Sequence, residues 1–194
     1  LPPPHAQASG AAADCAPDRE WQGFPPEATA VKPSHWPEPH HPKTDVSWYQ
    51  AVTYCRWLTA LCDRLVDAGQ LDPRKIPGGE IRLPDEWEWQ WAAAGAEQRK
   101  FPWGQDYEEG LANLDETRNE RGQYNIQRTS AVGIYPKGHT PPHSDSHNWA
   151  DLAGNVWEWC RNSHENPDKL WSATLDSSEW RTLRGGSWVG TADF

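Results

Sequence analysis

The sequence predicts an α+β domain with two helices, short antiparallel strands and much ordered irregular structure. Helical periodicity occurs in two segments of the first half, whereas from Gly95 onward turns separate short apolar pieces such as "AVGIY" and "WRTLRGGSW". These pieces are too few and too short for a sheet-dominated fold. Only 36% of the residues are hydrophobic but 14 are Trp, so we expect aromatic rings to supply much of the core.

Residues 1–40 differ in composition from the rest of the chain. They are rich in Pro, Ala and His and show no periodic apolar pattern. We therefore expect a flexible or loop-like segment there, followed by a folded domain over residues 41–194.

The first predicted helix lies in "DVSWYQAVTYCRWLTALCDRLVDAG", residues 45–69. Ser47 and Gln50 have the spacing of a capping box, and Gly69 is a C-terminal stop. The apolar positions recur at intervals of three and four residues, as on one face of an amphipathic helix. These positions are Ala51, Tyr54, Cys55, Leu58, Cys62 and Leu65.

A second, shorter helix follows "IRLP". Asp85 and Glu88 repeat the capping-box spacing, and Gly95 ends the segment. Trp87 and Trp91 are four residues apart and share a helix face. We expect this face to pack against the Tyr54, Leu58 and Leu65 face of the first helix.

Charge and cysteine usage restrict the function. The net charge is −10, with no long run of either sign, which argues against a nucleic-acid partner. No apolar run is long enough to cross a bilayer. Four cysteines without a C-x-x-C pair indicate neither a disulfide scaffold nor a zinc site. We expect a soluble protein, and the cysteines, which form no evident pairs, favour a cytoplasmic location.

The stretch "DLAGNVWEWC", residues 151–160, places Glu158 between Trp157 and Trp159. A buried carboxylate needs a partner. In an extended segment the two rings point to one face and Glu158 to the other. From the residues alone, Glu158 either caps a loop or pairs with an arginine such as Arg161 or Arg184.

Seven motifs resemble the formylglycine-generating enzyme, or sulfatase-modifying factor, superfamily in order and approximate spacing. They span residues 41–188, about three quarters of the chain. The resemblance implies the C-type lectin-like fold of that family, and a domain cut short at its C-terminus. The motifs are "HPKTDVSWYQAVTYCRWL", "IRLPDEWEWQWAAAG", "FPWG", "ANL", "AVGIYPKG", "DLAGNVWEWC" and "LRGGSW".

The resemblance also implies a structural calcium ion in the loop that contains Glu158. Its ligands are the first and eighth side chains and the fourth and sixth carbonyls, all hard oxygen donors as Ca²⁺ requires. In this sequence they are Asp151, Gly154, Val156 and Glu158. A second family site would use the Asn113 side chain and the Leu114 carbonyl. Its carboxylate is expected near "GQYNIQ", where this sequence has Tyr124 instead.

Formylglycine-generating enzymes place an active cysteine three residues after the Ser of "RGGS" and a second one five residues later, and the pair binds copper. Three residues after Ser187 this chain has Gly190, and the second position lies beyond Phe194. We therefore expect no copper site, because the soft thiolate ligands are missing. Acidic pairs such as Asp115 with Glu116 are expected in exposed turns.

Two classes of function follow from the resemblance. The first is a non-catalytic ligand- or protein-binding module, of the kind found in the variable proteins of diversity-generating retroelements. Its binding face would comprise Ser187, Trp188, Val189, Gly190, Thr191, Asp193 and Phe194. The alternative is an enzyme of different chemistry, such as a cysteine-independent oxidase of the same superfamily, because one fold hosts many activities.

Overall fold

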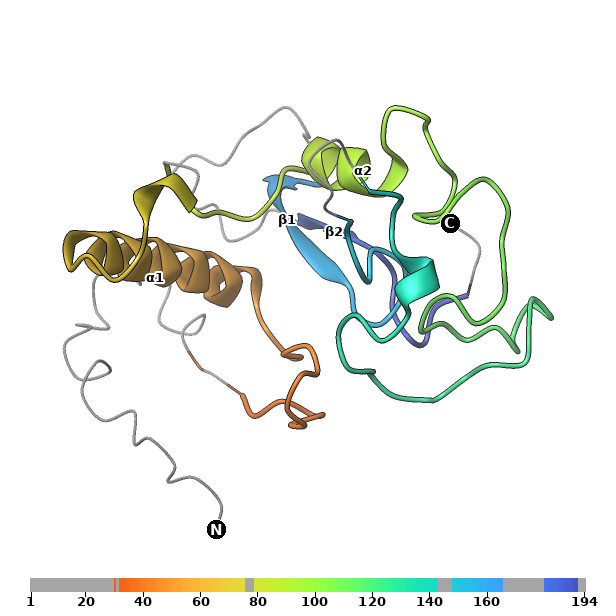
Figure 1. Cartoon of the computed structure of the whole chain (residues 1–194). Coiled ribbons are helices and arrows are strands. Elements are labelled where there is room, and N and C mark those ends of the chain that lie inside the picture. The colour runs from red at the N-terminus through yellow and green to blue at the C-terminus, as the bar shows by residue number, and fades with distance from the viewer. Residues whose placement is uncertain (1–29, 31, 76–78, 143–147, 166–179, 192–194) are drawn as a thin grey trace, which may run out of the picture.

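The computed structural model describes residue 30 and residues 32–75, 79–142, 148–165 and 180–191. The regular elements are two α-helices, two short 3₁₀ helices (Pro73–Lys75 and Pro136–Gly138) and two strands. Most of the other described residues form loops without regular structure (Figure 1). The predicted α+β class is confirmed.

Helix α1, Trp48–Asp67, begins and ends where its sequence predicts. The Gln50 N–H donates to Ser47 Oγ at 3.2 Å, and the Ser47 N–H donates to Gln50 Oε1 at 2.9 Å. This reciprocal pair is the expected capping box, which satisfies two backbone donors of the first turn. Just beyond the helix, Gly69 adopts a φ of 67°, in the left-handed region that favours glycine.

Helix α2, Glu86–Ala94, also forms as predicted. The Asp85 N–H donates to Glu88 Oε2 at 2.8 Å. The Arg82 guanidinium binds both oxygens of Glu88, each at 2.7 Å. These hydrogen bonds lower the pKa of Glu88 to about 2. Gly95 ends the helix with a φ of 64°.

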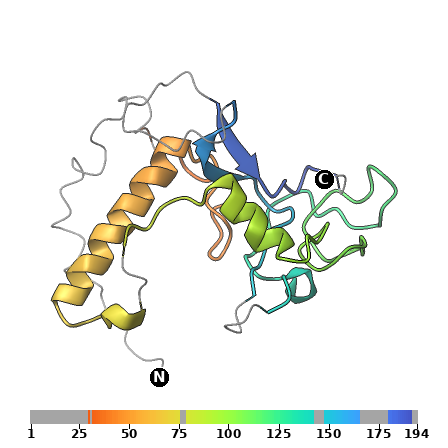
Figure 2. The ribbon, with the colours of Figure 1, turned by 90° about the horizontal axis from the view of Figure 1, so that it is seen from above.

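Strands β1, Glu158–Ser163, and β2, Arg181–Arg184, form an antiparallel pair. Glu158 pairs with Arg184 and Trp159 with Leu183, before an irregularity shifts the register. Helix α2 packs against both strands. Figures 1 and 2 show α1 extending away from this sheet, with only its amino-terminal end close to it.

The predicted packing of the two helices is wrong. Trp87, Trp91 and Tyr54 are 60%, 59% and 59% exposed. Helix α2 instead turns Trp89 inward, so the two flanking tryptophans face outward. In α1 the buried residues are Trp48 and Thr53, both near its amino-terminal end. The Trp48 indole N–H donates to the Cys160 carbonyl at 2.9 Å and fixes that end to β1.

The core lies beneath the loops rather than between the helices. Ala112, Leu114 and Ala153 form a buried cluster, against which Trp103 and Tyr107 pack. Phe101 stacks on Trp103, with ring centroids 5.3 Å apart. Aromatic rings thus contribute to the core as expected, although Trp149, Trp157 and Trp180 are exposed.

The three described cysteines form no disulfide bond. Cys55 and Cys62 are half-buried, Cys160 is fully buried, and all three are free thiols. Cys15 lies outside the described residues. None of the described helices is both long enough and apolar enough to cross a bilayer.

Candidate functional site

The loop that leads into β1 holds Asp151 and Glu158, both predicted calcium ligands. Asp151 has a φ of 56°, and its Oδ2 accepts from the Gly133 N–H at 2.6 Å. Glu158 is half-buried at the start of β1, and its Oε2 accepts from the Trp89 indole N–H at 2.7 Å. In each carboxylate one oxygen is therefore bonded, and the other accepts no hydrogen bond within the described part of the chain.

The surroundings of Glu158 disfavour its negative charge. Burial raises its pKa, the Trp89 hydrogen bond partly offsets this rise, and the charge of Asp151 raises it further. The predicted arginine partners are elsewhere, because the Arg184 guanidinium pairs with Glu86 and Arg161 interacts with the Glu88 carboxylate. The alternative of an arginine partner for Glu158 is therefore wrong.

Between Asp151 and Glu158, some main-chain carbonyl groups accept hydrogen bonds and others do not. The Asn155 carbonyl accepts from the Trp188 N–H at 3.0 Å, and the Gly154 N–H donates to the Gly185 carbonyl at 2.6 Å. Within the described residues, the carbonyls of Gly154 and Val156 accept no hydrogen bond. These are the two carbonyl oxygens that the family resemblance assigns to calcium.

Asn113 and Leu114, the residues of the expected second site, are both buried. The Asn113 amide donates to the Arg128 carbonyl at 2.9 Å and to Ser130 Oγ at 3.2 Å. The main-chain carbonyl of Asn113 accepts from the Asn155 N–H at 2.9 Å, so Asn113 ties neighbouring loops to the loop of residues 151–158. Among the described residues, no three His, Cys, Asp or Glu side chains gather as a metal site.

Glu116 was expected in an exposed turn but is fully buried, with 0% exposure, and Asp115 is 8% exposed. The Glu116 Oε1 atom accepts from the Tyr107 hydroxyl at 2.5 Å and from the Gly110 N–H at 2.7 Å. Burial, and then this hydrogen bond, raise the pKa of Tyr107. Both donors precede Glu116 in the same loop, but no regular spacing in the sequence marks them as its partners.

The predicted binding face follows a turn at Gly185 and Gly186, whose φ angles are 88° and 73°. Gly190 closes a second turn, since its N–H donates to the Ser187 carbonyl at 2.8 Å and its carbonyl accepts from the Asp115 N–H at 2.9 Å. Val189 is 45% exposed. The structure thus brings Ser187, Trp188, Val189, Gly190 and Thr191 together, whereas Asp193 and Phe194 lie outside the described residues.

The sequence profile of one protein family, described as the sulfatase-modifying factor enzyme 1-like domain, matches residues 13–194. The chain belongs to this family. One similar protein is the inactive C-alpha-formylglycine-generating enzyme 2 of Bos taurus, which is 31% identical over 78% of this chain and 40% of its own length. The protein of the same name in Mus musculus is 29% identical over 78% of this chain and 39% of its own length. The formylglycine-generating enzyme of Streptomyces coelicolor is 31% identical over 82% of this chain and 49% of its own length.

The chain spans less than half the length of these sulfatase-modifying factor relatives. Relatives named as enzymes and relatives named inactive both occur among them. The position that the family resemblance assigns to the active cysteine is Gly190, in the closed turn of residues 187–190. Cys160, in β1, is completely buried, and burial raises the pKa of its thiol to about 12.

Proposed function

We propose that this chain is a non-catalytic ligand- or protein-binding module of the sulfatase-modifying factor family, with residues 187–191 at its binding face. The observation that carries the proposal is Gly190, at the position that the family resemblance assigns to the active cysteine. Its amide and carbonyl groups both form main-chain hydrogen bonds. No thiol belongs to this turn, so the soft ligands of a copper centre are missing from it.

The geometry of the turn supports a role in binding. Main-chain bonds from Asn155 and Asp115 hold Trp188 and Gly190 in place, while the Val189 side chain stays exposed. A face that is already ordered loses little conformational entropy when it binds a partner. The mixed helices, short sheet and long ordered loops support a C-type lectin-like scaffold of the retroelement variable-protein type.

The proposal includes a structural calcium ion in the loop of residues 151–158. The carboxylates of Asp151 and Glu158 and the carbonyls of Gly154 and Val156 would hold it, and oxygen donors of this kind suit Ca²⁺. The donors fit, because a positive ion would offset the mutual repulsion of the two acids. The set around Asn113 and Leu114 lacks a charged ligand among the described residues, so we limit the proposal to one ion.

A matched pair of variants tests the binding face. Val189 is 45% exposed and Ile126, outside the face, is 46% exposed. The wild-type protein is titrated against immobilised panels of glycans and peptides, and each ligand bound is tested again with Val189→Asp and Ile126→Asp. We expect Val189→Asp to abolish binding and Ile126→Asp to retain it. Equal binding by both variants would place the ligand elsewhere and refute the face.

A second measurement tests the absence of catalysis. The protein is incubated with copper, oxygen and a peptide that carries a sulfatase-type cysteine motif, and aldehyde is measured by mass spectrometry. We expect no aldehyde above a protein-free blank. Copper-dependent turnover would overturn the non-catalytic interpretation, whatever the binding panels show.

A further inference from the structure

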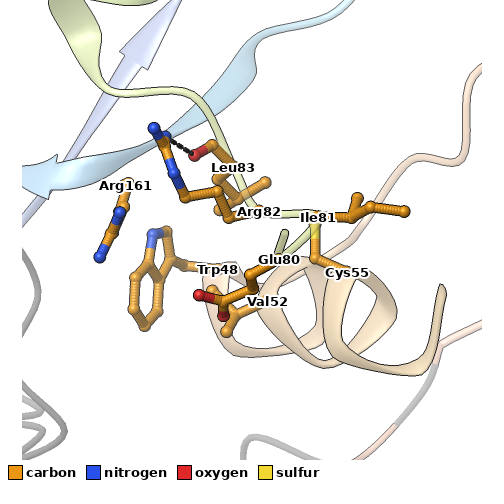
Figure 3. Close-up of a pocket in the computed structure, with 8 residues that line it drawn as sticks. All are labelled: Trp48, Val52, Cys55, Glu80, Ile81, Arg82, Leu83 and Arg161. Carbon is orange, nitrogen blue, oxygen red and sulfur yellow. Dashed lines mark hydrogen bonds between the residues drawn. The ribbon is translucent and has the colours of Figure 1, made fainter. Parts of the chain in front are cut away.

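The pocket between α1 and the segment that leads into α2 encloses only about 20 Å³, room for roughly one water molecule (Figure 3). Its guanidinium groups are already compensated, because Arg82 is bonded to the Glu88 carboxylate and Arg161 interacts with the same carboxylate. This pocket therefore offers no site for an organic ligand. A more accessible cation lies beside the turn of residues 187–191.

Arg118 lies next to that turn, in the loop that follows Leu114. Its Nη1–H donates to the Val189 carbonyl at 3.4 Å, and the Gly190 carbonyl accepts from the Asp115 N–H at 2.9 Å. Loop and turn are thus joined at two successive residues of the turn. Because the carbonyl and the side chain of one residue are close together, a ligand on the exposed Val189 side chain is within reach of the Arg118 guanidinium.

The acids nearest to Arg118 in its loop are buried. Asp115 and Glu116 have little or no exposed surface, whereas the Arg118 side chain is 59% exposed. Asp115 Oδ2 lies 3.8 Å from Arg118 Nε, and Asp115 Oδ1 accepts from the Thr117 hydroxyl at 2.7 Å. A partly exposed ion pair of this length holds a guanidinium only weakly.

The charges that follow in the loop do not cancel this one. Glu120 and Arg121 are both exposed and opposite in sign. The surface beside the turn therefore presents a local positive charge, although the net charge of the chain is −10. A face of this kind attracts an anionic ligand.

We infer that the face at residues 187–191 binds a peptide in which an acidic residue adjoins an apolar one, and that Arg118 selects its carboxylate. A planar guanidinium can pair with a carboxylate through two parallel hydrogen bonds. The apolar neighbour lies against the exposed Val189 side chain. A neutral glycan offers neither group. This inference rests on the function proposed for the face.

Paired peptide arrays test the preference for an acid. Each peptide carries Asp or Glu beside Leu, Val or Phe, and has one twin with Asn or Gln and another with Lys in place of the acid. We expect the whole chain to bind acidic peptides at least about tenfold more tightly than their amide twins, as loss of a charge-assisted hydrogen bond predicts. Equal binding of the twins, or no binding to the array, would overturn the inference.

Charge variants assign the preference to Arg118. Arg118→Gln should remove it, and Arg118→Glu should transfer binding to the Lys twins, which a purely supporting role of this side chain would not produce. Arg74→Gln removes the same charge from an 88% exposed side chain, beyond the end of α1 that lies away from the sheet (Figure 2), and should keep the preference. Thermal melts confirm that each variant is folded. A preference for acid that survives either change at Arg118, or that Arg74→Gln removes as well, refutes the assignment.

Comparison with Val189→Asp separates this inference from the function on which it rests. If that variant loses peptide binding but the wild type shows no preference for acid, the face stands and only the role of Arg118 is refuted. Acid-selective binding that Val189→Asp leaves intact would place the ligand outside the face and refute both. Selection of sialylated glycans over their asialo forms, with no peptide bound, would support the face but refute the peptide as its ligand.

Discussion

If Asp151 and Glu158 hold the proposed calcium ion, Glu158→Gln should change stability in opposite directions with and without calcium. Without the ion, glutamine keeps an oxygen that can accept from the Trp89 indole N–H and removes a charge that its surroundings disfavour. We therefore expect the metal-free variant to melt at a higher temperature than the metal-free wild type. With calcium the order should reverse, because the variant loses a charged ligand.

The magnitude for the wild type follows from mass action. Millimolar calcium over a micromolar site stabilises the folded state by about 4 kcal/mol. For a domain of this size, such a gain corresponds to a rise in Tm of about 10 °C. Differential scanning calorimetry in a chelator and in calcium measures both proteins under both conditions.

The control is Glu165→Gln, at an exposed acid just beyond β1. It should leave the response to calcium unchanged. The reasoning fails if chelator does not alter the melting curve of a wild-type preparation that was loaded with calcium. It also fails if Glu158→Gln responds to calcium as strongly as the wild type, because Glu158 would then serve only as an acceptor for Trp89.

Three further outcomes follow from single contacts. Trp91→Ala should cost less than about 1 kcal/mol in urea unfolding, because its ring is 59% exposed. Trp89→Phe keeps a ring but removes the donor to Glu158, so it should cost about 1–3 kcal/mol in the same assay. Glu88→Gln should cost about 1 kcal/mol at neutral pH, since its pair with Arg82 is partly exposed. Because the folded pKa of Glu88 is about 2 and its ordinary value is 4.5, this difference should be full above pH 4.5 and vanish as the pH falls towards 2.

Sequence reasoning was most successful where structure depends on neighbouring residues. Both capping boxes involve side chains three positions apart, so Ser47 and Asp85 could be assigned as helix starts from the sequence. Which face of each helix is buried could not be predicted from the sequence. The spacing of Trp87 and Trp91 showed that they share a face, but tertiary contacts decided that this face is exposed.

In the candidate site, too, local features were predictable and long-range contacts were not. The motif around Asp151 located the loop, but it could not reveal that Glu158 bonds to Trp89, because 69 positions separate the two residues. Glu116 gave no signal at all. Its burial depends on the Tyr107 hydroxyl and the Gly110 N–H, which the same loop folds back onto the carboxylate, and turn-rich sequence around an acid ordinarily predicts a solvated surface.

The support of residues 187–191 has a consequence for how this surface tolerates change. Their described hydrogen bonds use the main chain of the turn, with no side chain of Ser187, Val189 or Thr191 taking part. The backbone shape is therefore largely independent of residue identity at these three positions. By contrast, a Cβ at Gly154 would lie 2.3 Å from the Asn113 carbonyl oxygen. Substitutions at these three positions can thus change the chemical groups on the exposed surface, while the main-chain support that depends on Gly154 stays the same.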